Sequence, residues 1–525
     1  MTDRRPLSPL VALLVLAALL NPAPSHAQGP CGVVDAIDFP VDPDHFFVVY
    51  PYGLPSSRFD GRYHAGEDWF SGRATTYGAP VRAIAPGRVT YSEPLGWGRD
   101  KGVVIIEHLM PDGTLWYSLY GHMEEVEGAT FPSVYTCVDR GDVVGAIGRP
   151  RPAPHLHLEI RNFGPDSPGP GYWGTDPTLS GWRNPSKFIV NWQAWLNPAH
   201  RWHADIADET GPHWPGIIRP DGGTIVYDDG RLKALNPSGQ VLWRYILPED
   251  LTVVGVLPEG DNVLVAGYDG RLQLWSQQGG FVEGWQLPHN INAAPLRWGD
   301  LLVVHTPEDQ MIAYGPDRAE RWRVPDVPYV VAMQATDQLL AVQAGRGTLV
   351  FIRPDGVVPG RATLRGAGDL APAPDGGFYL RSRYSLWHVD PAGAWHWLND
   401  APDVTRGSSA LHSLPDGRFF LFSGSRERIL HAYDAQGQPR WSVPLVELLG
   451  QPFFFSQGGA LLLADGFGAA LVVGAESGAL CNQVRVWGWR AAGAWAGLGG
   501  DGVLRLHVAD QVIGLDWASL AAGCR

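Results

Sequence analysis

A unit of about forty residues recurs through the C-terminal part of this 525-residue chain and limits its fold more than any other feature. The clearest copy runs from Asp229 to Trp243 and reads DGRLKALNPSGQVLW. Matching positions in successive copies lie 40, 40, 37, 38, 44, 39 and 34 residues apart; they are Gly230, Gly270, Gln310, Gly347, Ser385, Ile429, Gly468 and Gly502. A period near 40 that combines short strands with turns is typical of a four-stranded β-propeller blade.

The clearest copy also shows how such a unit folds. Residues 232–235 are expected to form a strand, 236–239 a turn, and 241–243 the start of the next strand. A Trp recurs in six of the eight copies, where it can pack between neighbouring blades. The unit resembles the PQQ-type repeat of quinoprotein-like β-propellers over roughly residues 203–525, and its eight copies predict seven or eight blades. The matched positions are packing residues, so the repeat by itself does not indicate that the propeller binds a quinone cofactor.

The N-terminus carries the pattern of a secretory signal peptide over residues 1–27. Arg4 and Arg5 precede an apolar run at residues 10–20, and Ser25-His26-Ala27 provides a small-residue cleavage site. The run is too short to cross a bilayer, although an uncleaved anchor is the alternative. No later segment offers about 18 consecutive apolar residues, so we expect a secreted or cell-envelope protein without a membrane span after cleavage.

Four cysteines fit the same compartment, because an even number in an exported chain favours disulfides. Three pairings are formally possible. We favour Cys31–Cys137 and Cys481–Cys524, since the first two cysteines fall in one expected domain and the last two in another. None belongs to a C-x-x-C pair, so neither a zinc–thiolate site nor a redox motif is indicated.

Composition supports an all-β chain and argues against nucleic acid as a partner. The 65 Gly and 45 Pro residues suit turn-rich β structure and disfavour long helical bundles. The formal net charge of −14 lacks the basic surplus that binding to a phosphate backbone requires. We expect a peptidase-like domain at 28–192, a linker at 193–202 and the propeller at 203–525.

The residues that could bind a metal ion or act in catalysis lie in three short segments of the first domain. They read HAGED at 64–68, YGH at 120–122 and HLHLE at 155–159. If the third is a strand, His155, His157 and Glu159 share one face while the intervening leucines enter the core.

These residue types are those of a catalytic zinc site. Such a site takes three nitrogen or oxygen ligands and leaves one position for water, and His64, Asp68 and His157 can supply the three. His122 and His155 can then orient the water, take its proton or stabilise the oxyanion. The chain has no H-E-x-x-H sequence, so a glutamate-based zincin mechanism is excluded.

In this order the segments resemble the lysostaphin/LytM-type zinc metallopeptidases, which are peptidoglycan endopeptidases. The family pattern is H-x-x-x-D, a separate His, and then H-x-H. The resemblance covers about 150 residues. It implies a compact antiparallel β-sandwich with a narrow groove, zinc held by His64, Asp68 and His157, and catalytic roles for His122 and His155.

Two positions depart from that family. Glu67 replaces an aliphatic residue, and residues 149–154 read RPRPAP where relatives have a Gly/Ser/Thr-rich loop. Such segments line the groove, so the cleavage specificity stays open. The nearby His108 is expected to pack or hydrogen-bond within a strand, and Tyr63, Trp69 and Trp97 to serve aromatic packing. Glu159 is either a partner of a metal ligand or a solvated strand residue.

The sequence therefore predicts an exported zinc metalloendopeptidase that cleaves peptide cross-links of bacterial peptidoglycan. The propeller would be its binding or targeting module, with a protein or a glycan as partner. The alternative is a non-enzymatic scaffold of the cell envelope, or an activator of another wall hydrolase. The complete set of metal ligands argues against this alternative.

Overall fold

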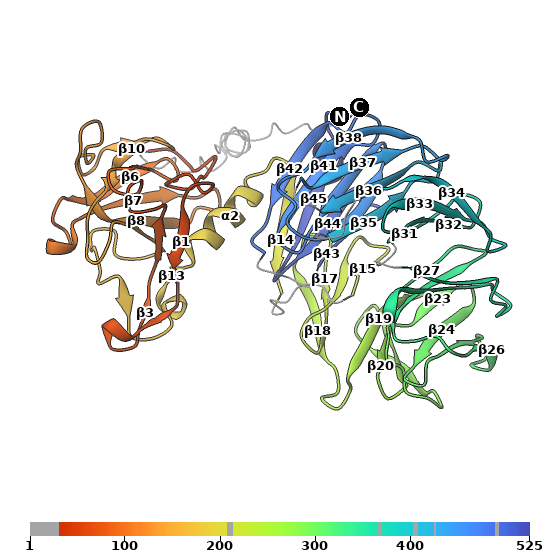
Figure 1. Cartoon of the computed structure of the whole chain (residues 1–525). Helices are drawn as coiled ribbons and strands as arrows, with labels where there is room; N and C mark the ends of the chain where they lie inside the picture. Colours follow the sequence, from red (N-terminus) through yellow and green to blue (C-terminus); the bar gives the residue numbers. More distant parts are fainter. Residues whose placement is uncertain are drawn as a thin grey trace, which may run out of the picture. The chain divides into compact units, whose positions relative to one another are not determined.

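A computed structural model describes residues 31–206, 214–364, 369–402, 408–424, 427–488 and 493–524. The expected signal peptide at 1–27 lies outside these residues. The chain divides into two compact units, Met1–Trp192 and Gln193–Arg525, and strands dominate the described part of both, which confirms the all-β class (Figure 1).

Among the residues that the structure describes, helices are few and short. They are α2 (Pro185–Trp195), α3 (Trp517–Leu520) and the 3-10 helices η1 (Ser57–Phe59), η2 (Gly98–Asp100), η3 (Pro177–Ser180) and η4 (Gly345–Gly347). Within the described ranges, none has the length and apolar character needed to span a bilayer.

The first unit is built on a ten-stranded antiparallel sheet with the order β1-β4-β11-β8-β7-β6-β9, to which β10, β5 and β13 are added. Its strands are β1 (Phe47–Tyr50), β4 (Glu67–Phe70), β5 (Pro80–Arg82), β6 (Gly87–Glu93), β7 (Gly102–Leu109), β8 (Leu115–Glu124), β9 (Cys137–Val138), β10 (Val143–Ile147), β11 (Leu156–Arg161) and β13 (Trp182–Arg183). A second sheet pairs β12 (Tyr172–Trp173), β3 (Arg62–His64) and β2 (Pro55–Ser56).

Strand β11 lies between β4 and β8, and its alternation follows the predicted pattern. Leu156 and Leu158 are fully buried in the core, whereas His157 pairs in register with Asp68 of β4 and with Gly121 of β8. The register of such a strand is fixed, because a slip of one residue against its neighbours would move every side chain to the opposite face of the sheet.

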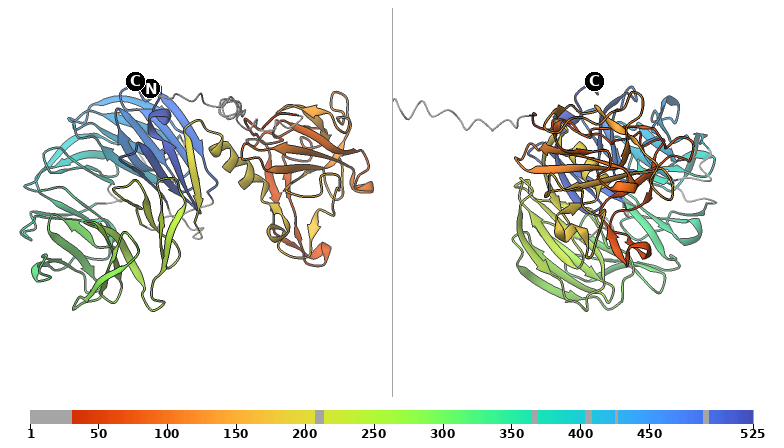
Figure 2. Two further views of the ribbon diagram at one scale, coloured as in Figure 1. Left: turned by 180° about the vertical axis from the view of Figure 1, so that it is seen from behind. Right: turned by 90° about the vertical axis from the view of Figure 1, so that its left-hand side faces the viewer.

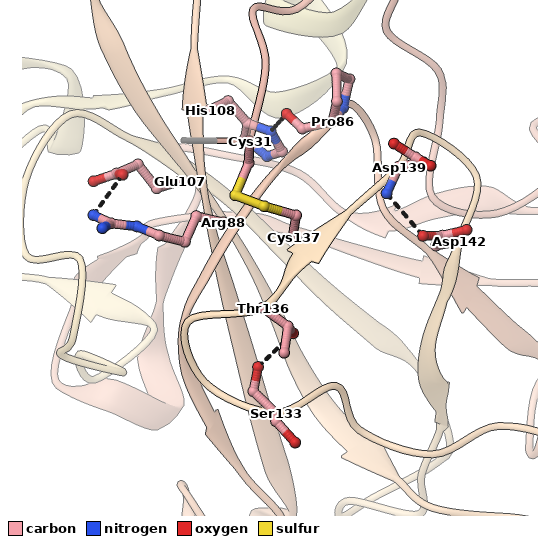
Figure 3. Close-up of a disulfide and its surroundings, with 10 residues drawn as sticks. All are labelled: Cys31, Pro86, Arg88, Glu107, His108, Ser133, Thr136, Cys137, Asp139 and Asp142. Atoms are coloured by element: carbon pink, nitrogen blue, oxygen red, sulfur yellow. Dashed lines mark hydrogen bonds and ion pairs between the residues drawn. A yellow bond between two sulfur atoms is a disulfide. The ribbon is translucent and has the colours of Figure 1, made fainter. Parts of the chain in front are cut away.

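The disulfide Cys31–Cys137 joins the N-terminal segment to β9, as predicted, and lies close to His108 in Figure 3. His108 is buried; its Nδ1 donates to the Pro86 carbonyl at 2.9 Å, and its Nε2 lies 2.8 Å from the Ser118 hydroxyl. Burial lowers the pKa of His108 to about 4. The expected structural role of His108 within a strand is thereby confirmed.

The second unit is a β-propeller of eight four-stranded antiparallel sheets within the described residues. Seven are continuous in sequence and comprise β15 (Ile217–Ile218), β16 (Thr224–Tyr227), β17 (Arg231–Leu235) and β18 (Val241–Ile246); β19 (Val253–Glu259), β20 (Asn262–Gly267), β21 (Arg271–Ser276) and β22 (Phe281–Gln286); β23 (Leu296–Trp298), β24 (Leu301–Thr306), β25 (Gln310–Tyr314) and β26 (Glu320–Val324); β27 (Val330–Ala335), β28 (Leu340–Ala344), β29 (Thr348–Ile352) and β30 (Gly360–Thr363); β31 (Asp369–Pro372), β32 (Phe378–Arg381), β33 (Ser385–Val389) and β34 (Trp395–Asp400); β35 (Ser408–Ser413), β36 (Phe419–Gly424), β37 (Ile429–Tyr433) and β38 (Pro439–Pro444); and β39 (Phe453–Gln457), β40 (Ala460–Ala464), β41 (Ala469–Gly474) and β42 (Leu480–Arg485).

The eighth sheet is completed by the beginning of the unit. It pairs β43 (Ala494–Leu498), β44 (Val503–Val508) and β45 (Gln511–Asp516) with β14 (His200–Asp205). The yellow β14 therefore lies beside the blue C-terminal strands in Figure 1, and the reverse view agrees (Figure 2). The predicted disulfide Cys481–Cys524 also forms, and it links β42 of the preceding sheet to the C-terminal end.

The segment 193–202, expected as a linker, includes the end of a helix and the start of a strand. Residues 193–195 are the end of α2, and β14 begins at His200. Ala194 and Ala199 are each only 1 % exposed because they belong to the apolar cluster that includes β44 and β45. Burial of these side chains, which the sequence does not reveal, turns the expected connection into part of the propeller.

The apolar cores of the second unit lie between neighbouring sheets rather than within one sheet. The recurrent Trp contributes to them as predicted. Trp243 stacks on Gly279 of the next sheet and donates from Nε1 to the Gln277 carbonyl at 3.1 Å. Trp202 of β14 packs in the same way on Gly239, so the last sheet is joined to the first.

The Trp202–Gly239 contact predicts a stability effect that a matched glycine isolates. Gly239 has φ +80°, and an added Cβ would lie 2.3 Å from Trp202 Cε3, whereas Gly230 has φ +73° and no atom within 4 Å of that position. Gly230→Ala should cost about 1–2 kcal/mol from the left-handed conformation. Gly239→Ala should cost about 1–3 kcal/mol more from overpacking. Thermal unfolding of the two full-length variants measures the difference; equal melting temperatures would contradict the role of this contact.

Candidate functional site

Three side chains from β3, β4 and β11 converge on one point. His64 Nε2 lies 3.0 Å from His157 Nδ1 and 3.3 Å from Asp68 Oδ1, and His157 Nδ1 lies 3.0 Å from the same carboxylate oxygen. A tetrahedral zinc with bonds of ~2.0–2.1 Å holds its ligand atoms roughly 3.3 Å apart. The three residues are therefore spaced to hold a divalent metal ion.

The second nitrogen of each imidazole has its own acceptor, which fixes the ring. His64 Nδ1 donates to the Pro51 carbonyl at 3.2 Å, and His157 Nε2 donates to Glu159 Oε1 at 3.0 Å. His64 Nε2 and His157 Nδ1 are the nitrogens that face the common point beside Asp68 Oδ1, and once deprotonated they can offer their lone pairs to a metal ion. Metal-binding histidines use their other nitrogen in this way.

Glu159 is itself held in place. It is 1 % exposed, and its Oε2 accepts from Trp182 Nε1 at 2.8 Å and lies 3.5 Å from the guanidinium of the buried Arg161. The buried carboxylate is thus hydrogen-bonded and paired, as burial of a charge requires. The structure decides between the two expectations for Glu159: it is the partner of His157 and not a solvated residue.

These contacts shift the protonation of the set. Burial opposes the charge of Asp68, but hydrogen bonds from His157 and His64 outweigh it and lower the pKa of this carboxyl well below its usual range. Burial likewise opposes the charged form of His157, while Asp68 and Glu159 raise its pKa to about 9. The carboxylates of Asp68 and Glu159 accordingly favour a positive charge at the point where the three side chains meet.

His122 and His155 lie next to this set. Their rings are 4.5 Å apart, and His155 Nε2 is 3.6 Å from Asp68 Oδ2. In each ring Nδ1 donates to a backbone carbonyl, that of Asp100 for His122 and that of Ala153 for His155. Burial, followed by the neighbouring histidines, lowers the pKa of His122 to about 3, so its ring is neutral.

A β-bulge directs His122 toward the site. Gly102 and Val103 of β7 pair with Met123 and Gly121 of β8, which leaves His122 unpaired with φ +63°. A positive φ is costly for a non-glycine residue and is found at functional sites. Bulges next to active sites re-aim side chains in this manner.

Four of the five residues, Asp68, His122, His155 and His157, line a groove of about 500 Å³, and the buried His64 contacts two of them. Aromatic rings form much of the remaining wall: Tyr50, Phe59, Phe70, Trp97 and Tyr172. The rings of Tyr50 and Tyr172 lie 4.8 and 5.1 Å from that of His64. The size is that of a site for a small molecule or a few residues of a peptide.

The structure brings together all five residues that the sequence singled out. Of the aromatic residues expected to pack, Trp69 does so against Phe39, but Trp97 lines the groove and contacts His122 and His157. Sequence reasoning missed Tyr50 and Tyr172, since no spacing connects them to the histidines.

Glu67 is not among the residues that line the groove. It is buried, and its carboxylate accepts a hydrogen bond from Ser186 Oγ at 2.6 Å. Burial raises the pKa of Glu67 to about 7.

Comparison with protein families agrees with the division of the chain into two units. Residues 62–168 match peptidase family M23, and residues 228–370 match the family described as outer membrane protein assembly factor BamB. The first range contains all five site residues, and the second covers several of the recurrent units. No curated protein matches the chain.

Several solved structures resemble the chain at low sequence identity. BamB from Moraxella catarrhalis has 14% identity and a TM-score of 0.44, covering 60% of this chain and 99% of its own. Quinohemoprotein alcohol dehydrogenase from Comamonas testosteroni has 13% identity and a TM-score of 0.45, covering 62% and 78%. Chaetomium thermophilum Sqt1, bound to the N-terminus of ribosomal protein L10, has 14% identity and a TM-score of 0.47, covering 60% and 100%.

Proposed function

We propose that this chain, whose residues 62–168 match peptidase family M23, is an exported zinc metalloendopeptidase that hydrolyses peptide cross-links of bacterial peptidoglycan. One observation carries the proposal: His64, Asp68 and His157 direct three donor atoms at one point inside a groove, beside two further imidazoles. A non-enzymatic relative would have no need for so complete a set.

The residues divide the chemistry between them. A zinc ion bound by His64, Asp68 and His157 would polarise the scissile carbonyl and activate a water molecule. Because the Nδ1 atoms of His122 and His155 are already bonded, their Nε2 atoms are available to the substrate and the water. One such nitrogen can accept the proton of the attacking water, and a protonated one can donate to the oxygen that becomes negative.

An extracytoplasmic location is supported by both disulfides, which form and persist in oxidising compartments. The propeller then serves as a module that binds a protein or a glycan of the cell envelope and delivers the peptidase to its substrate. Support for this role is the repetition of one four-stranded scaffold, in whose described residues no second cluster of His, Cys, Asp and Glu is spaced to hold a metal ion.

We expect the purified protein to bind about one zinc ion per chain, and Asp68→Ala and His157→Ala to lose both the metal and the release of peptides from peptidoglycan. The reason is the removal of one of three ligands. Elemental analysis and chromatography of the digest give the two measurements. His45→Ala, an exposed histidine bonded only to Asp42 in its vicinity, is the control. Full activity of His157→Ala would refute the metal assignment.

His122→Ala and His155→Ala should retain zinc and lose turnover. Removal of a general acid or base typically costs ~10²–10⁴-fold. We expect this loss mainly in kcat, with KM nearly unchanged, because neither ring is needed to hold the metal. Steady-state kinetics on a purified cross-linked peptide, together with zinc content, separates the two effects. A variant that loses its zinc would place that histidine among the ligands instead.

Replacing Glu159 tests its hold on His157. Glu159→Ala should lower the zinc affinity about 10–100-fold, the usual effect of removing a hydrogen-bond partner of a metal ligand. Glu159→Gln, whose amide oxygen can still accept from Nε2, should lose less. Competition with a chelator measures the affinity, and the exposed Glu127→Ala serves as control. Equal zinc affinity in all three variants would show that the Glu159–His157 contact does not position the ligand.

A further inference from the structure

Two arginines stand in the wall of the groove without a partner of opposite charge. Arg58 and Arg151 both line it, both are exposed, and neither forms an ion pair with any residue in the described part of the chain. Some other arginines of the same unit do form ion pairs, for example Arg88 with Glu107 at 2.8 Å. The chain as a whole carries a formal charge of −14, so unpaired cations in this groove do not reflect a generally basic surface.

Arg58 belongs to the flank of the groove that contains His64. Its guanidinium carbon lies 5.4 Å from the centre of the Phe59 ring, and Phe59 stacks on Tyr172 with ring centres 3.9 Å apart. Tyr172 in turn lies 5.1 Å from His64. A single aromatic stack therefore separates this positive charge from the metal-binding residues.

Arg151 belongs to the flank that contains His155. It is in the segment that departs from the Gly/Ser/Thr-rich loop of similar peptidases, and residues 151–154 all line the groove. The same segment fixes His155, whose Nδ1 donates to the Ala153 carbonyl at 2.8 Å. The segment thus adds a cation close to the reacting groups where a small neutral loop would add none.

Among the described residues, neither acidic residue of the lining forms an ion pair with the two arginines. Asp68 is held by His64 and His157. Asp100 has a buried Oδ1 atom that no hydrogen bond from an arginine reaches. We propose that Arg58 and Arg151 bind free carboxylates of the substrate, so that the groove selects acidic peptides. A guanidinium fork suits a carboxylate because it can form two parallel hydrogen bonds. The inference rests on the proposed peptidase function.

The test compares one substrate in two charge states. Cross-linked muropeptide dimers with free carboxyl groups are used as such and after their carboxyl groups have been converted chemically to amides. The zinc-loaded wild-type protein should cleave the acidic dimers with a kcat/KM about ten-fold higher. Arg58→Gln and Arg151→Gln should raise KM for the acidic dimers by a similar factor, leave kcat nearly unchanged, and have little effect on the amidated dimers.

The controls separate charge from folding. Arg73→Gln removes an exposed arginine outside the groove and should change neither substrate, while Arg151→Lys should retain part of the preference. Equal kcat/KM of the wild type on both dimers, or equal losses on both in the Gln variants, would overturn the inference. Failure of the wild type to cleave either dimer would refute the proposed function instead. Calorimetric binding of the two dimers to the full-length protein then decides the inference: a preference for the acidic dimers supports it, and equal binding overturns it.

Discussion

The pairing of β11 with β4 on one side and β8 on the other is the interaction on which the candidate site depends. Backbone hydrogen bonds set His157 opposite Asp68 and opposite Gly121, next to the bulge that presents His122. Residues that lie 36 and 89 positions from His157 in the sequence are thus held beside it by the pairing of regular strands. Because a strand alternates its faces, the same register also buries Leu156 and Leu158, so core packing and ligand geometry are fixed together.

The free-energy cost of burying several ionisable groups next to this core has to be offset by other interactions. Buried charges are costly unless paired and hydrogen-bonded. Here the compensation runs along one face of β11, from His157 to Glu159 and on to Arg161, which donates to the Gly164 carbonyl at 2.8 Å. Pro170 and Gly171, a few residues further on, line the groove, and Trp97, which also lines it, donates to the Gly169 carbonyl at 2.8 Å. The contacts that hold His157 and the shape of the groove wall are thereby parts of one network.

Sequence patterns predict much of this arrangement and miss identifiable parts of it. The forty-residue period predicts the propeller, because each unit repeats its own strands and turns, but ring closure depends on the pairing of β14 with β45, which no local pattern encodes. The H-x-x-x-D and H-x-H spacings predict which residues gather, since they fix side chains on strands. The burial of Glu159 and the contribution of Tyr50, Tyr172 and Arg58 depend on how distant segments fold over the groove, and single residues at irregular spacing give no signal of that.

Closure of the propeller through β14 has a consequence for the order in which the protein acquires its structure. Arg201 of β14 and Asp516 at the end of β45 form an ion pair across 315 residues of sequence. During synthesis or export the strand that follows the first unit must wait for nearly the whole second unit before its partner exists. The first unit contains all its own strands and can complete itself while the chain behind it is unfinished. The unit with the candidate site can therefore mature first, and a chain truncated near its C-terminus would combine an intact groove with a propeller that cannot close.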